Sequence, residues 1–435
     1  MIRCLVFIFG CVVTFSVLRA DSALDLLGGF DEARIEATFP PRNEEALGDL
    51  AKVIYRLQSV AEESLRTRLG ESSPANLGDA VEVTGELQRV AAVPIPESLI
   101  EFLEFEQLYL ADVMTQQGPC RLFSASFPPD AREGDRISGL GVVIELNSEG
   151  RWYVMAAPRI QWKPSTAAKI GWQMLGEADF DVTLLSDVQQ RSRQPLLADD
   201  GDAFYTLMAA ANRIGDSTDN PDPAKPASVE LLKRSEELTG DWMSLVMETV
   251  QITRIVVSEP RRQSQLGQDY YYQIDAVVDL GGVVVKINRR DPSSGPPVIF
   301  QNRYPVSVVT AEIPDFLKQR IRAQEGGDAV VSQHRSLIEV DGFFYRLWSY
   351  QSEFMNQQGG GDQFGPLIVS AQITDLSPTS DDPAGVQIIG WFAATAVIVG
   401  ILFFWLWSRL STVRDRRAKT QRQDREAEHV QLPTE

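Results

Sequence analysis

Histidine and cysteine, the side chains most often used for nucleophilic and metal chemistry, are scarce in this sequence. The two histidines are His334 and His429, and His429 lies close to the C-terminus. A Ser/His/acid triad needs a histidine that accepts the hydroxyl proton, and the chain has no Gly-x-Ser-x-Gly turn. A zinc site needs at least three protein ligands, which Cys120 and His334 cannot supply. The sequence therefore predicts no catalytic residue of these kinds, no metal and no cofactor.

Acidic side chains cluster at residues 199–202 and 216–222, where calcium would be the expected metal. An EF-hand loop needs glycine at its sixth position and glutamate at its twelfth. Counted from residue 216, those positions hold Pro221 and Ala227. A solvated linker and the start of a helix explain the two clusters instead.

Paired carboxylates can hydrolyse glycosidic bonds without any other catalytic group, so acidic residues that lie close together deserve the same test. Glu101, Glu104 and Glu106 are close in the sequence, but 60 acidic residues make such proximity common. A carboxylate-dependent hydrolase therefore stays an alternative, with no catalytic residue assigned.

A row of aromatic and basic side chains in the second half of the chain predicts recognition. Phe344, Arg346, Trp348 and Tyr350 alternate along one predicted strand, which places them on one face, and Tyr271 belongs to another strand. Aromatic rings on a barrel face can stack against sugars, peptide side chains or bases. The alternative, in which half of these rings fill the barrel core, stays open.

The charge of the chain narrows the choice of partner. Its 435 residues include 60 acidic and 41 basic side chains, which gives a formal charge of −19. Binding to nucleic acid through phosphate neutralisation needs clustered Lys and Arg, so this acidity argues against it. A protein, a peptide or a neutral glycan is the expected partner, and no nucleic acid. The length allows two or three domains.

Residues 1–20 are interpreted as a secretory signal peptide. The apolar run from Cys4 to Leu18 is too short to span a bilayer but has the length of a signal h-region. An uncleaved N-terminal anchor and a ten-residue lipoprotein leader that precedes Cys11 are the alternatives. After cleavage Cys120 is the one cysteine left, so no internal disulfide is expected.

The uncharged run from Ile388 to Trp407 predicts a transmembrane helix over residues 388–408, because twenty residues at 1.5 Å each cross the hydrocarbon layer. A polar juxtamembrane linker, 377–387, precedes it. The tail, 409–435, holds seven basic residues and is therefore expected on the cytoplasmic side. These features predict a single-pass type I protein of the cell membrane whose body is exported and whose partners include the lipid bilayer.

The body matches itself at a displacement of 150 residues. The matching pairs are Phe30 with Phe180, Asp31 with Asp181, Leu47 with Leu197, Asp49 with Asp199, Tyr55 with Tyr205 and Leu57 with Leu207. After an insertion in the second half, residues 83–89 resemble 248–254 and residues 138–143 resemble 340–345. Several weak matches in one order predict a duplication.

Each repeat is predicted to begin with helices and to continue as strands. Apolar residues recur every three or four positions between Glu44 and Leu69, and again between Asp199 and Ile214. Short runs rich in β-branched and aromatic residues predict the strands. These runs cover residues 80–93, 106–113, 138–146, 151–161, 245–257, 270–280, 282–287, 298–309, 337–350 and 367–373.

The predicted fold class is α+β: a tandem repeat of a helical lead and a small antiparallel OB-like β-barrel, followed by one transmembrane helix. The first unit is expected at 21–170 and the second at 171–376. Within the second unit, residues 215–226 contain three prolines and three aspartates and are expected to form an exposed linker.

The run from Asp341 to Tyr350, followed by Gly365 to Val369, resembles uncharacterised single-pass bacterial envelope proteins with paired OB-like domains. This resemblance covers about a third of the chain and implies an architecture without a known activity. Together with the absence of a catalytic motif, it predicts a non-enzymatic, membrane-anchored envelope protein that binds or scaffolds an unknown ligand. A single-pass receptor that signals through the cytoplasmic tail is a further alternative.

Overall fold

The computed structural model describes residues 22–69, 76–146, 153–287, 297–319, 329–333, 335–357 and 362–377. Described residues up to Leu376 belong to one compact unit. The predicted signal peptide, the predicted transmembrane segment, the tail and His334 lie outside the described residues, so the leader and the tail stay predictions.

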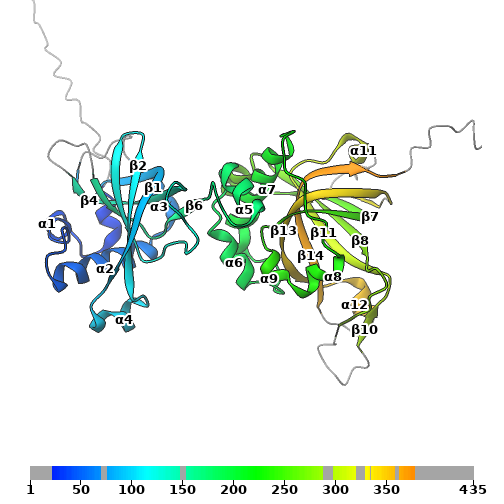
Figure 1. Cartoon of the computed structure of the whole chain (residues 1–435), viewed down its shortest axis with the longest axis horizontal. Helices are drawn as coiled ribbons and strands as arrows, with labels where there is room; N and C mark the ends of the chain where they lie inside the picture. Colours follow the sequence, from blue (N-terminus) through cyan, green and yellow to red (C-terminus); the bar gives the residue numbers. More distant parts are fainter. Residues whose placement is uncertain are drawn as a thin grey trace, which may run out of the picture. The chain divides into compact units, whose positions relative to one another are not determined.

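The first half of the chain forms a closed barrel of five strands, with β6 added at the side of β4 (Figure 1). The order around the barrel is β1-β2-β3-β5-β4, and β4 pairs again with β1. The strands are β1 (Ala80–Pro94), β2 (Gln107–Thr115), β3 (Gly118–Ser124), β4 (Arg136–Leu146), β5 (Tyr153–Ala156) and β6 (Gln161–Lys163). The helices are η1 (Ala23–Leu27), α1 (Glu32–Glu36), α2 (Glu44–Gln58), α3 (Glu62–Arg66) and α4 (Glu97–Leu103).

The second half repeats this topology in the order β7-β13-β14-β11-β8, and β8 pairs again with β7. The strands are β7 (Trp242–Val256), β8 (Tyr270–Asp279), β9 (Val285–Ile287), β10 (Val298–Phe300), β11 (Arg303–Thr310), β12 (Ala329–Gln333), β13 (Leu337–Tyr350) and β14 (Gln363–Asp375). The helices are α5 (Ile170–Glu177), α6 (Leu184–Gln190), η2 (Ala198–Asp200), α7 (Gly201–Gly215), α8 (Ser228–Lys233), α9 (Ser235–Leu238), α10 (Pro260–Leu266), α11 (Asp315–Lys318) and α12 (Glu353–Gln357). The strand β12 pairs with β7 outside the barrel, and β9 with β10 forms a separate hairpin.

The two barrels have the same strand register, including two β-bulges. In the ladder between β1 and β2 the extra residue is Gln88, and in the ladder between β7 and β8 it is Val250. In the ladder between β4 and β5 it is Ile144, and between β13 and β14 it is Tyr345. A bulge is a specific local feature of a ladder, so its recurrence at equivalent places shows that the halves share one architecture.

The sequence matches have the right order but a shifted register. They placed Ile252 on Leu87, whereas the ladders make Thr249 the equivalent of Leu87. The strand register also makes two glycines equivalent. Gly141 and Gly342 occupy equivalent positions, at which an added Cβ would lie 2.0 Å from the Ala156 carbonyl oxygen and 2.4 Å from the Val369 carbonyl oxygen.

Helices α2 and α7 cover equivalent outer faces of their barrels. The apolar face of α2 packs on Val142 and Ile144 of β4, and that of α7 packs on Phe343 and Tyr345 of β13. Each helix has fifteen residues and buries the side chains at its three-and-four spacing. The helical lead is therefore repeated together with the barrel.

Two parts of the predicted fold class are wrong. The barrels are not purely antiparallel, because β3 runs parallel to β5 and β11 runs parallel to β14. The predicted transmembrane helix is not seen. No helix among the described residues is both long and apolar enough to cross a bilayer, and residues 388–407 lie outside them. The description as a single-pass membrane protein, with the bilayer as partner, is therefore not retained.

Residues 215–226 carry no buried side chain, but they are attached to β7. The Ser244 amide donates to the Ala224 carbonyl oxygen at 2.8 Å, and the Trp242 indole donates to the Pro221 carbonyl oxygen at 2.9 Å. The segment is therefore exposed and also held in place.

Replacing either paired glycine with alanine is expected to destabilise its barrel, because the new methyl group would meet a carbonyl oxygen of the neighbouring strand. For Gly141→Ala and Gly342→Ala we expect a loss of about 2–3 kcal/mol in the free energy of unfolding, measured with urea. Gly48→Ala in α2 is the control, because its methyl group meets only the flexible end of Leu99 at 3.0 Å. A loss below about 1 kcal/mol in both barrel variants would contradict the shared close approach.

Burial of Cys120 predicts a stability that falls in alkaline solution. Burial raises the pKa of its thiol from 9.0 to about 12, although a hydrogen bond with Tyr153 acts in the opposite direction. Because the pKa is higher in the folded state, the thiol's contribution is complete below pH 9 and is lost as the pH rises towards 12. The unfolding free energy of Cys120→Ala is therefore expected to fall less steeply above pH 9 than that of the unchanged chain. Equal slopes in the two urea-unfolding series would exclude this contribution.

Candidate functional site

A groove of about 640 Å³ lies on the outer face of β8 and β11 in the second barrel. The end of β13 and residues of the neighbouring segments also line it: Val250, Phe300, Gln351, Ser352, Phe354 and Gln363. In chain order the five barrel strands are β7, β8, β11, β13 and β14, so β8 and β11 are the second and third, and α12 lies in the connection between the fourth and the fifth. OB-folds use this strand face and this connection to bind oligonucleotides and oligosaccharides.

The floor of the groove is polar and ordered by hydrogen bonds. Alternation along β8 buries Ile274 in the barrel and turns Gln273 and Asp275 outwards. The Gln273 amide donates to Asp275 Oδ1 at 2.9 Å, and the Ser307 hydroxyl donates to the same oxygen at 3.2 Å. The Asp275 carboxylate is therefore oriented by two neutral donors.

Two stacked rings form one wall. The rings of Trp348 and Tyr350 lie 4.7 Å apart with an interplanar angle of 28°. Tyr350 extends over Gly365, whose missing side chain leaves room for the ring. Burial raises the pKa of Tyr350, and the nearby Asp275 carboxylate raises it further, so the phenol is neutral. The indole nitrogen of Trp348 is buried and has no hydrogen-bond partner among the described residues.

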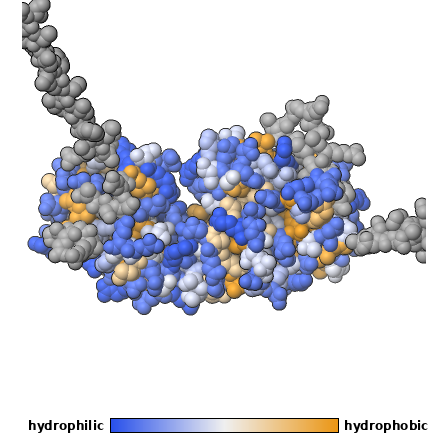
Figure 2. Space-filling model, turned by 90° about the horizontal axis from the view of Figure 1, so that it is seen from above, coloured by the Kyte–Doolittle hydropathy of each residue, from blue (hydrophilic) through white to orange (hydrophobic). Residues whose placement is uncertain are grey.

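The rim of the groove is mostly apolar. Phe354 is 45% exposed and Val250 is 46% exposed, while the Phe354 ring contacts that of Phe300 at 5.4 Å. Arg303 also lines the groove, but its guanidinium pairs with Glu248 at 2.8 Å. The face of the molecule seen in Figure 2 is mainly hydrophilic, with separate apolar patches.

The structure does not bring the five predicted site residues to one face. Phe344 is buried in the core of the second barrel. The bulge at Tyr345 interrupts the alternation, so Arg346 and Trp348 lie on the other side of the sheet from Phe344. Trp348 and Tyr350 line the groove.

Arg346 is completely buried and is held by the chain itself. Its guanidinium donates to Asp200 at 2.9 Å and to the carbonyl oxygens of Arg191 at 2.6 Å and Pro195 at 3.1 Å. The other oxygen of Asp200 accepts from the Arg191 side chain at 3.0 Å. Arg346 thus holds the segment before α7 against β13 and does not line the groove.

Tyr271 lies apart from the groove, in a smaller cavity of about 290 Å³ next to α7. Its ring meets those of Phe204 and Tyr205 edge to face at 5.6 and 6.1 Å, and burial raises the pKa of its hydroxyl. This arrangement is typical of aromatic packing between a helix and a sheet.

The acidic candidates show no carboxylate pair suited to hydrolysis. Glu101, Glu104 and Glu106 are all exposed. Among the described carboxyl groups, burial raises the pKa of Glu145 and Asp241, but one belongs to β4 and the other precedes β7.

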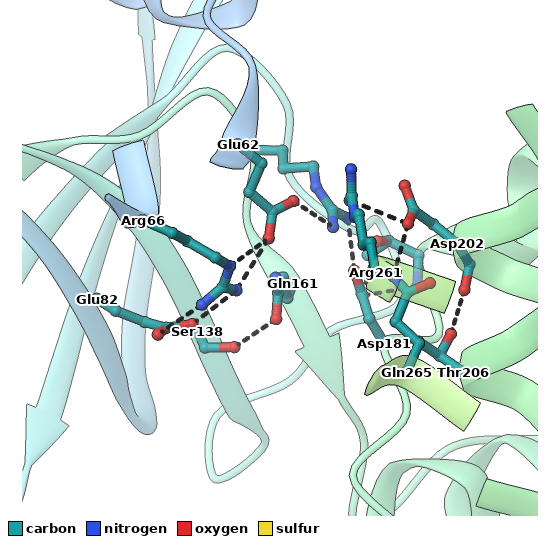
Figure 3. A network of polar contacts seen from close by, with 12 residues as sticks. Glu62, Arg66, Glu82, Ser138, Gln161, Asp181, Asp202, Thr206, Arg261 and Gln265 are labelled. Carbon is teal, nitrogen blue, oxygen red and sulfur yellow. Dashed lines mark hydrogen bonds and ion pairs between the residues drawn. The ribbon is translucent and has the colours of Figure 1, made fainter. Parts of the chain in front are cut away.

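A cavity of about 420 Å³ is lined by the charged network drawn in Figure 3. Arg66 bridges Glu62 at 2.9 Å and Glu82 at 3.0 Å, and Asp202 accepts from Arg261 at 3.0 Å. Glu62, Glu82 and Asp202 each have a basic partner, so these three carboxylates are bound by the chain itself.

Sequence reasoning missed the polar floor. The alternation of Gln273 and Asp275 with buried residues of β8 was visible in the sequence, but it is also typical of an ordinary solvated face. Their link to Ser307 depends on the pairing of β8 with β11, which no spacing along the chain reveals.

No family model matches the sequence, and no curated protein matches it. Solved structures match weakly. An aspartyl-tRNA synthetase from Entamoeba histolytica is 9% identical over 51% of this chain and 50% of that chain, with a TM-score of 0.15. A putative aspartyl-tRNA synthetase from Leishmania major Friedlin is 7% identical over 46% and 44%, with a TM-score of 0.14. Fission yeast Pot1 with ssDNA is 9% identical over 73% and 88%, with a TM-score of 0.16.

The chain thus spans about half the length of the two synthetase chains. The prediction that nucleic acid is not a partner is not retained; one of the matched structures is described with ssDNA. At these TM-scores the likeness gives no argument for nucleic-acid binding. The OB-like description rests on the strand order of the barrels, and the match to bacterial envelope proteins finds no support.

Removing the Arg346 guanidinium is expected to be costly, because the buried Asp200 would keep only Arg191 of its two basic partners and the carbonyl oxygens of Arg191 and Pro195 would lose a donor. For Arg346→Met we expect a loss of about 3–5 kcal/mol in the free energy of unfolding. Arg234→Met breaks an exposed pair with Glu237 and is expected to leave stability unchanged. The measurement is urea unfolding of the full chain, and equal stabilities of the two variants would contradict the structural role of Arg346.

Proposed function

We propose that this chain is a non-enzymatic binding protein and that the groove on β8 and β11 holds its ligand. The observation that supports the proposal is the combination of a stacked aromatic wall, Trp348 and Tyr350, with the hydrogen-bonded floor at Asp275. Ligand sites typically combine a mainly apolar lining with a few oriented polar groups, in volumes of about 300–1,000 Å³.

The chemistry of the lining defines what the ligand must offer. A flat or apolar group gains contact with Tyr350 and with the exposed rim residue Phe354. A hydrogen-bond donor of the ligand meets the oriented carboxylate of Asp275. No bond needs to be made or broken for these contacts, so the proposal is recognition without catalysis.

The proposal is tested with the full chain on arrays of short peptides and of neutral oligosaccharides. Phe354→Ala removes an exposed ring from the rim, and Tyr350→Ala removes the wall. Both are expected to weaken binding of the retained probes at least tenfold, because each removes stacking or apolar contact that the ligand needs. Tyr109→Ala, which removes a stacked ring of the first barrel, is the matched control and is expected to bind normally.

Thermal unfolding of each variant checks that the fold is kept. Phe354→Ala remains informative if Tyr350→Ala unfolds, since Phe354 is half exposed. Probes that bind both groove variants as well as the unchanged chain would overturn the proposal, and so would arrays without a retained probe.

A further inference from the structure

The shared register of the barrels shows what a carboxylate at the position of Asp275 can bind. Asp112 is the equivalent residue in the first barrel. Each aspartate lies on the second strand and pairs with the residue that directly follows the bulge of the first strand. Asp112 pairs across the ladder with Arg121, and Asp275 pairs with Ser307. Asp112 and Asp275 therefore occupy the same position in the two barrels.

In the first barrel this carboxylate binds two guanidinium groups. Asp112 Oδ1 accepts from Arg121 Nε at 2.9 Å, and Oδ2 accepts from the Arg89 side chain at 2.8 and 3.1 Å. The two arginines, with hydrogen bonding and charge, hold the pKa of Asp112 below its usual range despite its partial burial. The position is thus shaped for arginine.

In the second barrel the two arginines are replaced by neutral residues. The equivalents of Arg121 and Arg89 are Ser307 and Gln251. No basic side chain among the described residues forms an ion pair with Asp275. Arg303 of the rim pairs with Glu248 and lies opposite Asp279, four positions before Ser307 on β11. A half-buried carboxylate therefore faces a groove of 640 Å³ without a counter-charge.

We propose that this groove binds an arginine side chain of a partner peptide, whose guanidinium takes on Asp275 the place that Arg121 and Arg89 take on Asp112. This inference rests on the proposed function and names the ligand class of the same groove. The planar guanidinium can donate two hydrogen bonds to the carboxylate while its flat face packs beside Tyr350. Lysine offers a point charge without that face.

The overall charge supports a basic partner. The chain carries a formal charge of −19, which attracts a cationic peptide and raises its rate of encounter. General attraction of this kind does not depend on one carboxylate, so a variant of Asp275 separates it from specific recognition.

The experiment measures binding of the full chain to two fluorescent pentapeptides with blocked ends. One has a central arginine between glycines, and the other has citrulline at the same position. Citrulline keeps the shape of the side chain but has no charge. The arginine peptide is expected to bind at least tenfold more tightly. Asp275→Asn is expected to abolish this difference, whereas Asp112→Asn, the matched change in the first barrel, is expected to keep it.

Ser307→Arg provides a second and opposite test. It places an arginine at the position that Arg121 occupies in the first barrel, where the fold already accepts one. Ser307 is buried but borders the groove, into which the longer side chain can extend. The new guanidinium is expected to cover Asp275 and to weaken binding of the arginine peptide at least tenfold, and thermal unfolding checks that the variant keeps its fold. Tight binding by Ser307→Arg would count against the assigned position.

The outcomes distinguish this inference from the proposed function. Equal binding of the two peptides, unaffected by Asp275→Asn but lost in Phe354→Ala, would overturn arginine recognition and leave the groove as a binding site. An arginine preference that persists in Asp275→Asn would also overturn it, as attraction to the acidic surface only. Binding that Phe354→Ala and Tyr350→Ala leave unchanged would overturn both proposals. A neutral oligosaccharide that binds through the groove in place of the arginine peptide would refute the ligand class alone.

Discussion

The buried charge pair between Arg346 and Asp200 fixes the part of β13 on which the wall of the groove stands. Beyond Phe343, β13 no longer pairs with β7, so one of its edges is free. The segment before α7 takes that edge: the Arg193 amide donates to Leu347, and the Ser349 amide donates to Gln194. Arg346 binds this segment at three points. Because unpaired buried charges are costly, the segment and β13 must stay together, and Trp348 and Tyr350 are placed by that contact.

The barrels keep the same frame and differ in the chemistry of their faces. Bulges and close glycine contacts are set by the course of the backbone, and a change there would strain both neighbouring strands. Outward residues on the second and third strands have no such constraint. Asp112 and Asp275 have kept the carboxylate, while the arginines around the first have no counterpart around the second. The same backbone architecture therefore holds a carboxylate paired with arginines in the first barrel and a carboxylate with neutral donors in the second.

Much of the frame could be predicted from local pattern, and the rest depended on pairing. The strand predicted at 337–350 has the same bounds as β13, and the apolar period between Glu44 and Leu69 corresponds to α2 and α3. The strand β3 was missed, since it begins with Gly118 and Pro119, which are uncommon inside strands. The bulge at Tyr345 was also invisible, because an extra residue is defined by the partner strand β14 and not by the sequence around it.

The bulge at Tyr345 explains why the predicted row of aromatic and basic side chains does not lie on one face. Strict alternation puts Phe344, Arg346, Trp348 and Tyr350 on one face. One extra residue at Tyr345 turns the side chains that follow it to the opposite face of the sheet. Phe344 thereby fills the core, Arg346 meets Asp200, and only the last two rings reach the groove. The polar floor was missed for a different reason. Gln273 and Asp275 follow the ordinary alternation of an exposed face, so no pattern in the sequence distinguishes them. Among the described residues Asp275 differs from Asp112 in having no basic partner, and this difference becomes visible only when the two barrels are compared.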